Sequence, residues 1–121
     1  MPRDASDLDN HRIITFGSPV PSHLVDINYL EKVGRPDHQP RSANVQVNAI
    51  FGLIQAARAG VGIAMLPDYA VEGASELERV LPEIDLPEFE TYFVYPPALK
   101  NSKRVGIFRD FLVESARKWE F

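Results

Sequence analysis

The chain has 121 residues, of which 45% are hydrophobic and 25% charged, and its formal net charge is −4 at pH 7. This length and composition predict a single soluble domain with a modest hydrophobic core. The negative charge and the lack of a dense Lys/Arg cluster argue against direct binding to nucleic acid. The absence of cysteine excludes disulfides, thiol catalysis and thiolate-bound metals.

The first dozen residues, MPRDASDLDNHR, lack the apolar stretch of a signal peptide, and no later run reaches the roughly 18 apolar residues of a membrane span. We therefore expect a cytoplasmic protein without a membrane partner. Residues 11–17, HRIITFG, predict a first strand that ends at Gly17. Phe16 stands at the carboxyl end of that strand, where two readings stay open: the wall of a ligand site or part of the core.

Residues 21–33 place Leu24, Ile27 and Leu30 three apart, which predicts a short helix or helical turn. The loop GRPDHQP follows at residues 34–40. His23 and His38 have no third ligand at metal spacing, so we expect neither a metal nor another cofactor.

Residues 41–67, RSANVQVNAIFGLIQAARAGVGIAMLP, predict one strand–helix–strand unit. Ala43–Val47 alternates like a half-buried strand, Asn48 is a candidate N-cap, and Ala49–Ala59 has the apolar period of a helix. Gly60 suits the left-handed residue that closes a helix. Residues 61–66 are typical of a buried strand, which Pro67 ends. Two strands joined through one helix should be parallel, with a right-handed crossover.

This unit also predicts a ligand site. In open α/β sheets, ligands lie beyond the carboxyl ends of strands and beside helix N-termini. Here that place holds Asn48, Ala49, Ile50 and Phe51, with Pro67 beside them at the end of the strand that we expect to be the neighbour in the sheet. Free N–H groups and the positive end of the helix dipole favour an anionic or polar small molecule. The alternative is that Asn48 only caps the helix.

The remaining sequence predicts a short helix at 68–74, a short strand at 77–81, an acidic loop at 83–89, a strand at 90–95 and a final helix from Asn101 or Ser102. The scattered carboxylates of the acidic region indicate a solvated face. The final helix carries an apolar stripe opposite a charged side. The stripe consists of Val105, Phe108, Phe111, Leu112, Ser115, Ala116 and Trp119.

Three stretches together resemble the effector-binding domain of LysR-type transcriptional regulators. These are VQVNAIFGLIQAARAGVGIAMLPDYAV, the following LERVLPE, and YFVYPPALKNSKRVGIFRDFLVE, with DLDNHRIITFG similar to the entry into that domain's second lobe. The resemblance runs from about Asp7 to Phe121. It implies an α/β, periplasmic-binding-protein-like (type 2) lobe with a mixed, mainly parallel sheet flanked by helices.

The resemblance covers only part of the family's two-lobe domain, because no winged helix-turn-helix, linker helix or first lobe precedes Met1. It implies a second lobe over residues 11–89 and a return strand with a C-terminal helix over 90–121. It further implies an effector in the cleft between lobes, and DNA contact only through the domain that this chain lacks. The ligand-binding residues expected from position and resemblance together are Phe16, Gly17, Asn48, Ala49, Ile50, Phe51 and Pro67.

Other readings remain beside this one. A transport-type solute-binding protein shares the two-lobe architecture, and a truncated remnant would bind no ligand. Catalysis is not expected, because the sequence lacks a nucleophile motif, a phosphate loop and a dinucleotide fingerprint. In the family the C-terminal helix packs against the first lobe. Without that lobe we expect the helix Ser102–Trp119 to contact a second copy, so that the chain forms a homo-oligomer.

Overall fold

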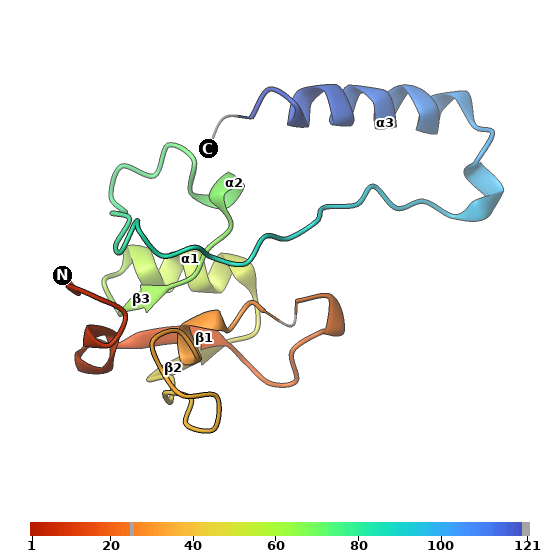
Figure 1. Ribbon diagram of the computed structural model, residues 1–121. Coiled ribbons are helices and arrows are strands. Elements are labelled where there is room, and N and C mark those ends of the chain that lie inside the picture. Colours follow the sequence, from red (N-terminus) through yellow and green to blue (C-terminus); the bar gives the residue numbers. More distant parts are fainter. Residues whose placement is uncertain (25, 120–121) are drawn as a thin grey trace. The chain divides into compact units, whose positions relative to one another are not determined.

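A computed structural model describes residues 1–24 and 26–119, which divide into two compact units, Met1–Glu88 and Phe89–Phe121. Figure 1 shows the first unit built around a small sheet, and the second as an extended segment followed by a helix. Each unit is described separately below.

The sheet of the first unit has three parallel strands, β1 (Ile13–Phe16), β2 (Val45–Val47) and β3 (Ile63–Ala64), in the order β2-β1-β3. The predicted α/β class and the parallel direction of the strands are therefore confirmed. β1 is apolar except for Thr15 and is buried at every position, as expected of a central parallel strand. The expectation that β2 and β3 are neighbours was wrong, because β1 lies between them.

Helix α1 (Ile50–Arg58) connects β2 to β3, and Gly60 follows it with a φ of +70°. The predicted helix and its left-handed closing residue are both confirmed. The N-cap prediction was wrong, since Ala49 occupies the cap position in an extended conformation and no side chain caps the helix. The run 61–66 is half-buried except at Met65, because β3 is an edge strand instead of an interior one.

Two apolar clusters lie on the two faces of β1, because successive side chains of a strand point to opposite faces. Ile14 and Phe16 pack with Ile27 and Leu53 of α1. Ile13 faces the other way, in a cluster with Leu8, Leu30, Val33 and Met65. The short helix or helical turn predicted at 21–33 takes the second form, as two separate 3-10 turns, Ser22–Leu24 and Tyr29–Glu31. Ile27 and Leu30 enter different clusters, so their spacing does not mark one helical face.

A buried arginine joins the N-terminal segment to this core. The Arg41 guanidinium donates to the carbonyls of Leu30, Val33 (2.8 Å) and Ala5 (3.1 Å), and its Nε donates to Asp9 at 2.9 Å. Arg35 binds the same Asp9 carboxylate from a more exposed position. Three carbonyls and one carboxylate therefore compensate the burial of the Arg41 charge.

Two carboxylates of the N-terminal segment, Asp7 and Asp9, have lowered pKa values, and we therefore expect the fold to lose stability in acid. The pKa of Asp7 is lowered to about 2, because the Asn10 side chain and the Arg3 main chain donate to its carboxylate. Hydrogen bonds from Arg35 and then Arg41 lower the pKa of Asp9. A carboxylate whose pKa is lower in the folded than in the unfolded state stabilises the fold. This stabilisation is complete above the pKa of the unfolded state and is lost as the pH falls through the pKa of the folded state.

We therefore expect the urea midpoint of unfolding to fall as the pH drops from about 4 toward 2. An Asp7→Asn/Asp9→Asn variant should start less stable and show a flatter pH dependence. Asp37→Asn, on a separate exposed loop, is the control and should follow the parent curve. Equal pH slopes for all three proteins would contradict this assignment.

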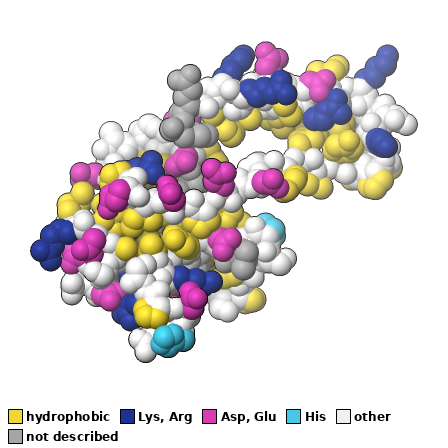
Figure 2. Space-filling model, in the orientation of Figure 1, with side chains coloured by type: hydrophobic (Ala, Val, Ile, Leu, Met, Phe, Trp, Pro, Cys, Tyr) yellow, Lys and Arg dark blue, Asp and Glu magenta, His cyan; other side chains and the backbone are white. Residues whose placement is uncertain are grey.

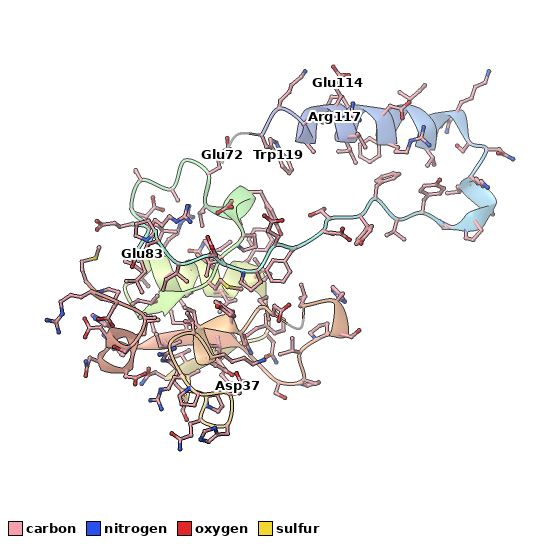
Figure 3. All side chains as sticks on the ribbon, viewed as in Figure 1. Asp37, Glu72, Glu83, Glu114, Arg117 and Trp119 are labelled. Atoms are coloured by element: carbon pink, nitrogen blue, oxygen red, sulfur yellow. The ribbon has the colours of Figure 1, made fainter. Side chains whose placement is uncertain are left out.

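After β3, helix α2 (Asp68–Val71) follows Pro67, and Gly73 has a φ of +73°, near where the sequence predicted the end of a short helix. The strand predicted at 77–81 was wrong, because these residues pair with no other strand among the described residues. Acidic side chains of the first unit are spread out, as Figure 3 shows for Asp37, Glu72 and Glu83. Glu76 pairs with Arg58 of α1 at 2.7 Å.

The second unit begins with an extended segment, continues through the 3-10 turn Pro97–Leu99 and ends with α3 (Lys103–Ala116). Ser102 caps α3, and its side chain accepts from the Val105 N–H at 3.5 Å, which confirms the predicted start. The strand predicted at 90–95 was wrong, because this extended segment has no paired strand within the described part of the chain. Aromatic and β-branched content favours extension, but a ladder also needs a neighbour.

No residue of α3 is buried in the described structure. Figure 2 shows charged side chains along one side of α3 and hydrophobic side chains along the other. Glu114 and Arg117, labelled in Figure 3, belong to the charged side. Phe108 lies on the other side, and its ring meets that of Phe93 edge-on at 5.9 Å. The predicted stripe is thus confirmed in position, and it stays largely open to solvent.

Candidate functional site

The candidate site lies at the carboxyl edge of the sheet, where β1 and β2 end side by side. The Gly17 N–H donates to the Val47 carbonyl at 3.1 Å, so the ladder continues one residue past β1. This pairing brings Gly17 beside Asn48, the residue that leads from β2 into α1. The sequence predicted that these two residues share a site, and the structure brings them together.

Gly17 lies in close approach to the Asn48 side chain. A Cβ placed on Gly17 would lie 1.7 Å from the Asn48 Oδ1 atom, far inside van der Waals contact. Gly17 is buried, whereas Asn48 is exposed. The Asn48 side chain therefore lies over the backbone at the end of β1, which explains why it does not cap α1. The polar carboxamide of Asn48 thus lies at the rim of the site.

The N-terminus of α1 adds main-chain donors. N–H groups in the first turn of a helix have no partner within that helix, and the dipole gives this end a partial positive charge. No acidic residue occurs in the first turn of α1, so this partial charge is not neutralised locally. Ala49 is exposed and Ile50 is half-buried. These features suit an anionic or strongly polar group.

An apolar hollow lies next to these donors. Ile50, Phe51 and Ile54 of α1 line it together with Tyr69 and Ala70 of α2. Phe51 is 80% exposed, an unusual position for a phenylalanine in a soluble domain. Pro67 is the N-cap residue of α2 and is half-buried, so it fixes the start of the helix that supplies Tyr69 and Ala70. Pro67 itself does not line the hollow.

Phe16 stands apart from the other predicted site residues. It is buried in the core with Ile14, Ile27 and Leu53. This position agrees with the second of the two readings that the sequence left open. The side chain of Phe16 thus lies in the core, while its backbone continues directly into Gly17 at the edge of the sheet.

Sequence reasoning missed Asn28, which completes the end of β1 on the side of β3. Its side-chain oxygen accepts from the Phe16 N–H at 2.8 Å, and its amide donates to the Phe16 carbonyl at 2.9 Å. β3 pairs only with Ile13 and Ile14, so the Asn28 side chain takes the place of a strand beyond that point. Its position in a predicted helical stretch gave no signal of this contact, which joins residues twelve apart.

The groups at the edge are hydrogen-bond donors and apolar side chains. Among residues 1–24 and 26–119, no three His, Cys, Asp or Glu side chains gather as a metal site. In the same residues, no helix is long and apolar enough to cross a membrane. The edge offers main-chain donors, one carboxamide and an adjoining apolar surface, the mixture typical of small-molecule sites.

A parallel α/β unit with such an edge belongs to the broad class of open α/β sheets, in which ligands bind beyond the carboxyl ends of the strands. A family model described as "LysR substrate binding domain" matches residues 1–117. The chain therefore belongs to the LysR substrate-binding domain family, a family of transcriptional regulators and not of enzymes, and it has that family's periplasmic-binding-protein-like fold.

A curated relative has a consistent name. The chain is 28% identical over 103 residues to an uncharacterized HTH-type transcriptional regulator of Haemophilus influenzae. The match covers 79% of this chain and 33% of the relative, so the chain spans about a third of the length of that protein. No solved structure gave a significant match.

Proposed function

We propose that this chain is the effector-sensing part of a LysR-type transcriptional regulator. A small anionic or polar molecule binds at the carboxyl edge of the sheet and at the start of α1. The polar end meets Asn48 and the first-turn N–H groups of α1, and an apolar portion rests against Phe51. The proposed contacts come from Gly17, Asn48, Ala49, Ile50 and Phe51. Phe16 and Pro67 complete the proposed site as supports, Phe16 from the core beneath the end of β1 and Pro67 at the start of α2.

One observation carries this proposal: the contact-distance approach of Gly17 to the Asn48 side chain, beside an uncapped helix N-terminus. A residue with a Cβ at position 17 would displace Asn48. The close approach therefore sets the carboxamide beside free main-chain donors.

The rest of the proposed regulator lies outside this chain. A first lobe would supply the second wall of the cleft, and a winged helix-turn-helix would contact DNA. Ligand binding would bring the two lobes together. It would thereby shift the equilibrium between regulator conformations that differ in their affinity for DNA. The name of the Haemophilus relative and the shorter span of this chain support a longer whole protein. Such a regulator would act in the cytoplasm.

The two units correspond to a division that we propose on functional grounds. Residues 11–89 form the second lobe, and residues 90–121 return toward the first. The chain divides into its two compact units between residues 88 and 89, which supports a boundary at this point of the sequence. Large apolar surfaces are rarely left exposed on soluble proteins. The exposed apolar stripe of α3, within Ser102–Trp119, therefore supports the proposal that two copies of this chain contact each other through this helix.

Amide NMR can locate the site with simple probes. The chain is titrated with acetate, succinate and benzoate while the ¹H–¹⁵N resonances are followed. We expect at least one carboxylate to shift the amides of Gly17 and of residues 49–51 in a saturable manner. Shifts confined to other regions, or no saturable shift with any of the three, would argue against an anion site here.

Asn48→Asp tests the role of charge in the same titration. A like charge a few Å from the ligand costs roughly 1–4 kcal/mol near a protein surface, so affinity should fall about fivefold or more. Asn48→Ser keeps the site neutral and retains a hydroxyl that can donate to the ligand, so it should lose less affinity than Asn48→Asp. An acidic residue is favourable at a helix N-terminus, so Asn48→Asp should stay folded. Unchanged affinity in Asn48→Asp would contradict the proposal.

A further inference from the structure

The main chain of Phe16, the last residue of β1, is bound on one edge by a side chain in place of a strand. The Asn28 side-chain oxygen accepts from the Phe16 N–H at 2.8 Å, and the Asn28 amide donates to the Phe16 carbonyl at 2.9 Å. The N–H and the carbonyl of one strand residue point to the same edge of a sheet, so a single carboxamide can bind both. Asn28 therefore supplies the pair of bonds that a neighbouring strand normally makes.

Pro67 explains why the segment after β3 does not supply these bonds. The pairing of β1 with β3 is parallel, and the Ile63 N–H donates to the Arg12 carbonyl at 2.8 Å. Four residues further along both segments, the same register would place the Pro67 nitrogen opposite the Phe16 carbonyl. Proline has no N–H to donate, so the ladder cannot continue at this point. The Asn28 amide supplies the donor that the ladder lacks.

The opposite edge of the same turn of chain leads to the proposed effector site. The Gly17 N–H donates to the Val47 carbonyl at 3.1 Å, and the Asn48 side chain lies over Gly17. Because Phe16 and Gly17 are consecutive, the end of β1 is bound by Asn28 on one side and by β2 on the other. Strand ends that lose such hydrogen bonds open more easily than the strand interior. Loss of the Asn28 bonds would therefore move Gly17 relative to Asn48.

We propose that Asn28 is a positioning residue of the effector site. It does not touch the ligand, but it holds the end of β1 so that Gly17 stays beside the Asn48 carboxamide. Without Asn28, the chain would also populate arrangements in which these two groups lie apart. The apparent affinity for a ligand falls in proportion to the fraction of molecules in the binding-competent arrangement. This inference rests on the proposed effector site and adds to it a residue that acts from outside.

Asn44 provides a matched control, because it makes a similar bond at the other end of β1. Its side-chain oxygen accepts from the Ile13 N–H at 2.8 Å, and its own N–H donates to the Ile13 carbonyl at 2.9 Å. Asn44→Ala removes the first bond and leaves the second, which belongs to the main chain. We expect both Asn28→Ala and Asn44→Ala to lower the urea midpoint of unfolding, since each removes a bond from a strand end. Only Asn28→Ala should change the site.

The first readout needs no ligand. The Asn48 Nδ2 atom lies 3.6 Å from the position that a Cβ would take on Gly17, which is close to one Gly17 α-proton. We therefore expect an NOE between the Asn48 side-chain amide and this proton in the parent and in Asn44→Ala. The NOE should weaken strongly or vanish in Asn28→Ala. An unchanged NOE in Asn28→Ala, an equal loss in both variants, or no NOE in the parent would overturn the proposal.

The second readout is the dissociation constant for whichever of acetate, succinate and benzoate binds the parent. Asn28→Ala should raise it about fivefold or more, the equivalent of roughly one hydrogen bond, whereas Asn44→Ala should stay within about twofold of the parent. Asn28→Ser, a milder change that keeps one hydroxyl near Phe16, should give an intermediate value. Absence of binding by the parent would overturn the effector site itself. Binding by the parent with equal affinity in all three variants would overturn only the role of Asn28.

Discussion

Replacing Arg41 by Met should lower the free energy of unfolding by about 3 kcal/mol or more, the range seen when one partner of a buried ionic cluster is removed. The Arg41 side chain is only 4% exposed and makes hydrogen bonds to three carbonyls and to Asp9. Methionine would fill much of the volume but would leave those carbonyls without a donor. Urea unfolding followed by far-UV circular dichroism measures the loss.

Arg35 is the matched control for this prediction. It binds the same Asp9 carboxylate at 3.0 Å, but its side chain is 30% exposed and water can replace it. Arg35→Met should therefore cost less than about 1 kcal/mol. Similar losses for the two variants would show that the pairing with Asp9, and not the buried carbonyls, accounts for the stabilisation by Arg41.

Replacing Gly34 by Ala should have the second large effect. Gly34 has a φ of +71°, and a Cβ there would lie 2.8 Å from the Ala5 carbonyl carbon and 2.9 Å from its oxygen. Left-handed strain costs about 1–2 kcal/mol, and a displaced backbone adds a similar amount. The shift would also move the Ala5 carbonyl away from Arg41. We expect a total loss of about 3 kcal/mol.

Gly60 separates strain from steric contact. It has nearly the same φ of +70°, yet a Cβ there would meet no atom within 4 Å. Gly60→Ala should therefore cost only the backbone strain, about 1 kcal/mol. Thermal unfolding of the two variants side by side gives the difference. If Gly34→Ala were no worse than Gly60→Ala, the close approach to Ala5 would be of no energetic consequence.

The sequence predicted correctly those elements that depend on residues close to one another in the chain. The 3.6-residue apolar period gave α1, and the glycine after it took the expected left-handed conformation at Gly60. A serine before a run of helix formers gave the cap of α3 at Ser102. These features depend on residues within one or two turns of each other, so the sequence displays them directly.

Features that depend on distant partners were not predictable in this way. The position of β1 between β2 and β3 comes from pairings across the chain. Arg41 binds Ala5 and Asp9, more than thirty residues away, and nothing in its neighbourhood marks it as buried. The predicted strands at 77–81 and 90–95 had suitable composition but found no neighbour among the described residues.

The candidate site was predicted in place but not in detail. The sequence located Gly17, Asn48 and the start of α1 at one edge, because parallel strands end together. It assigned Asn48 to capping, whereas that side chain lies over Gly17. The choice between these two contacts depends on tertiary packing of β1 beside β2. Burial of Phe16 likewise depends on Ile27 and Leu53, which the pattern around Phe16 does not reveal.

The central claim is that this chain is the effector-sensing lobe of a longer, DNA-binding LysR-type regulator. The most direct test is the sequence of the coding DNA upstream of the Met1 codon. The account predicts an in-frame extension that encodes a winged helix-turn-helix, a linker helix and a first lobe. An in-frame stop codon close upstream, with a ribosome-binding site placed for Met1, would contradict it.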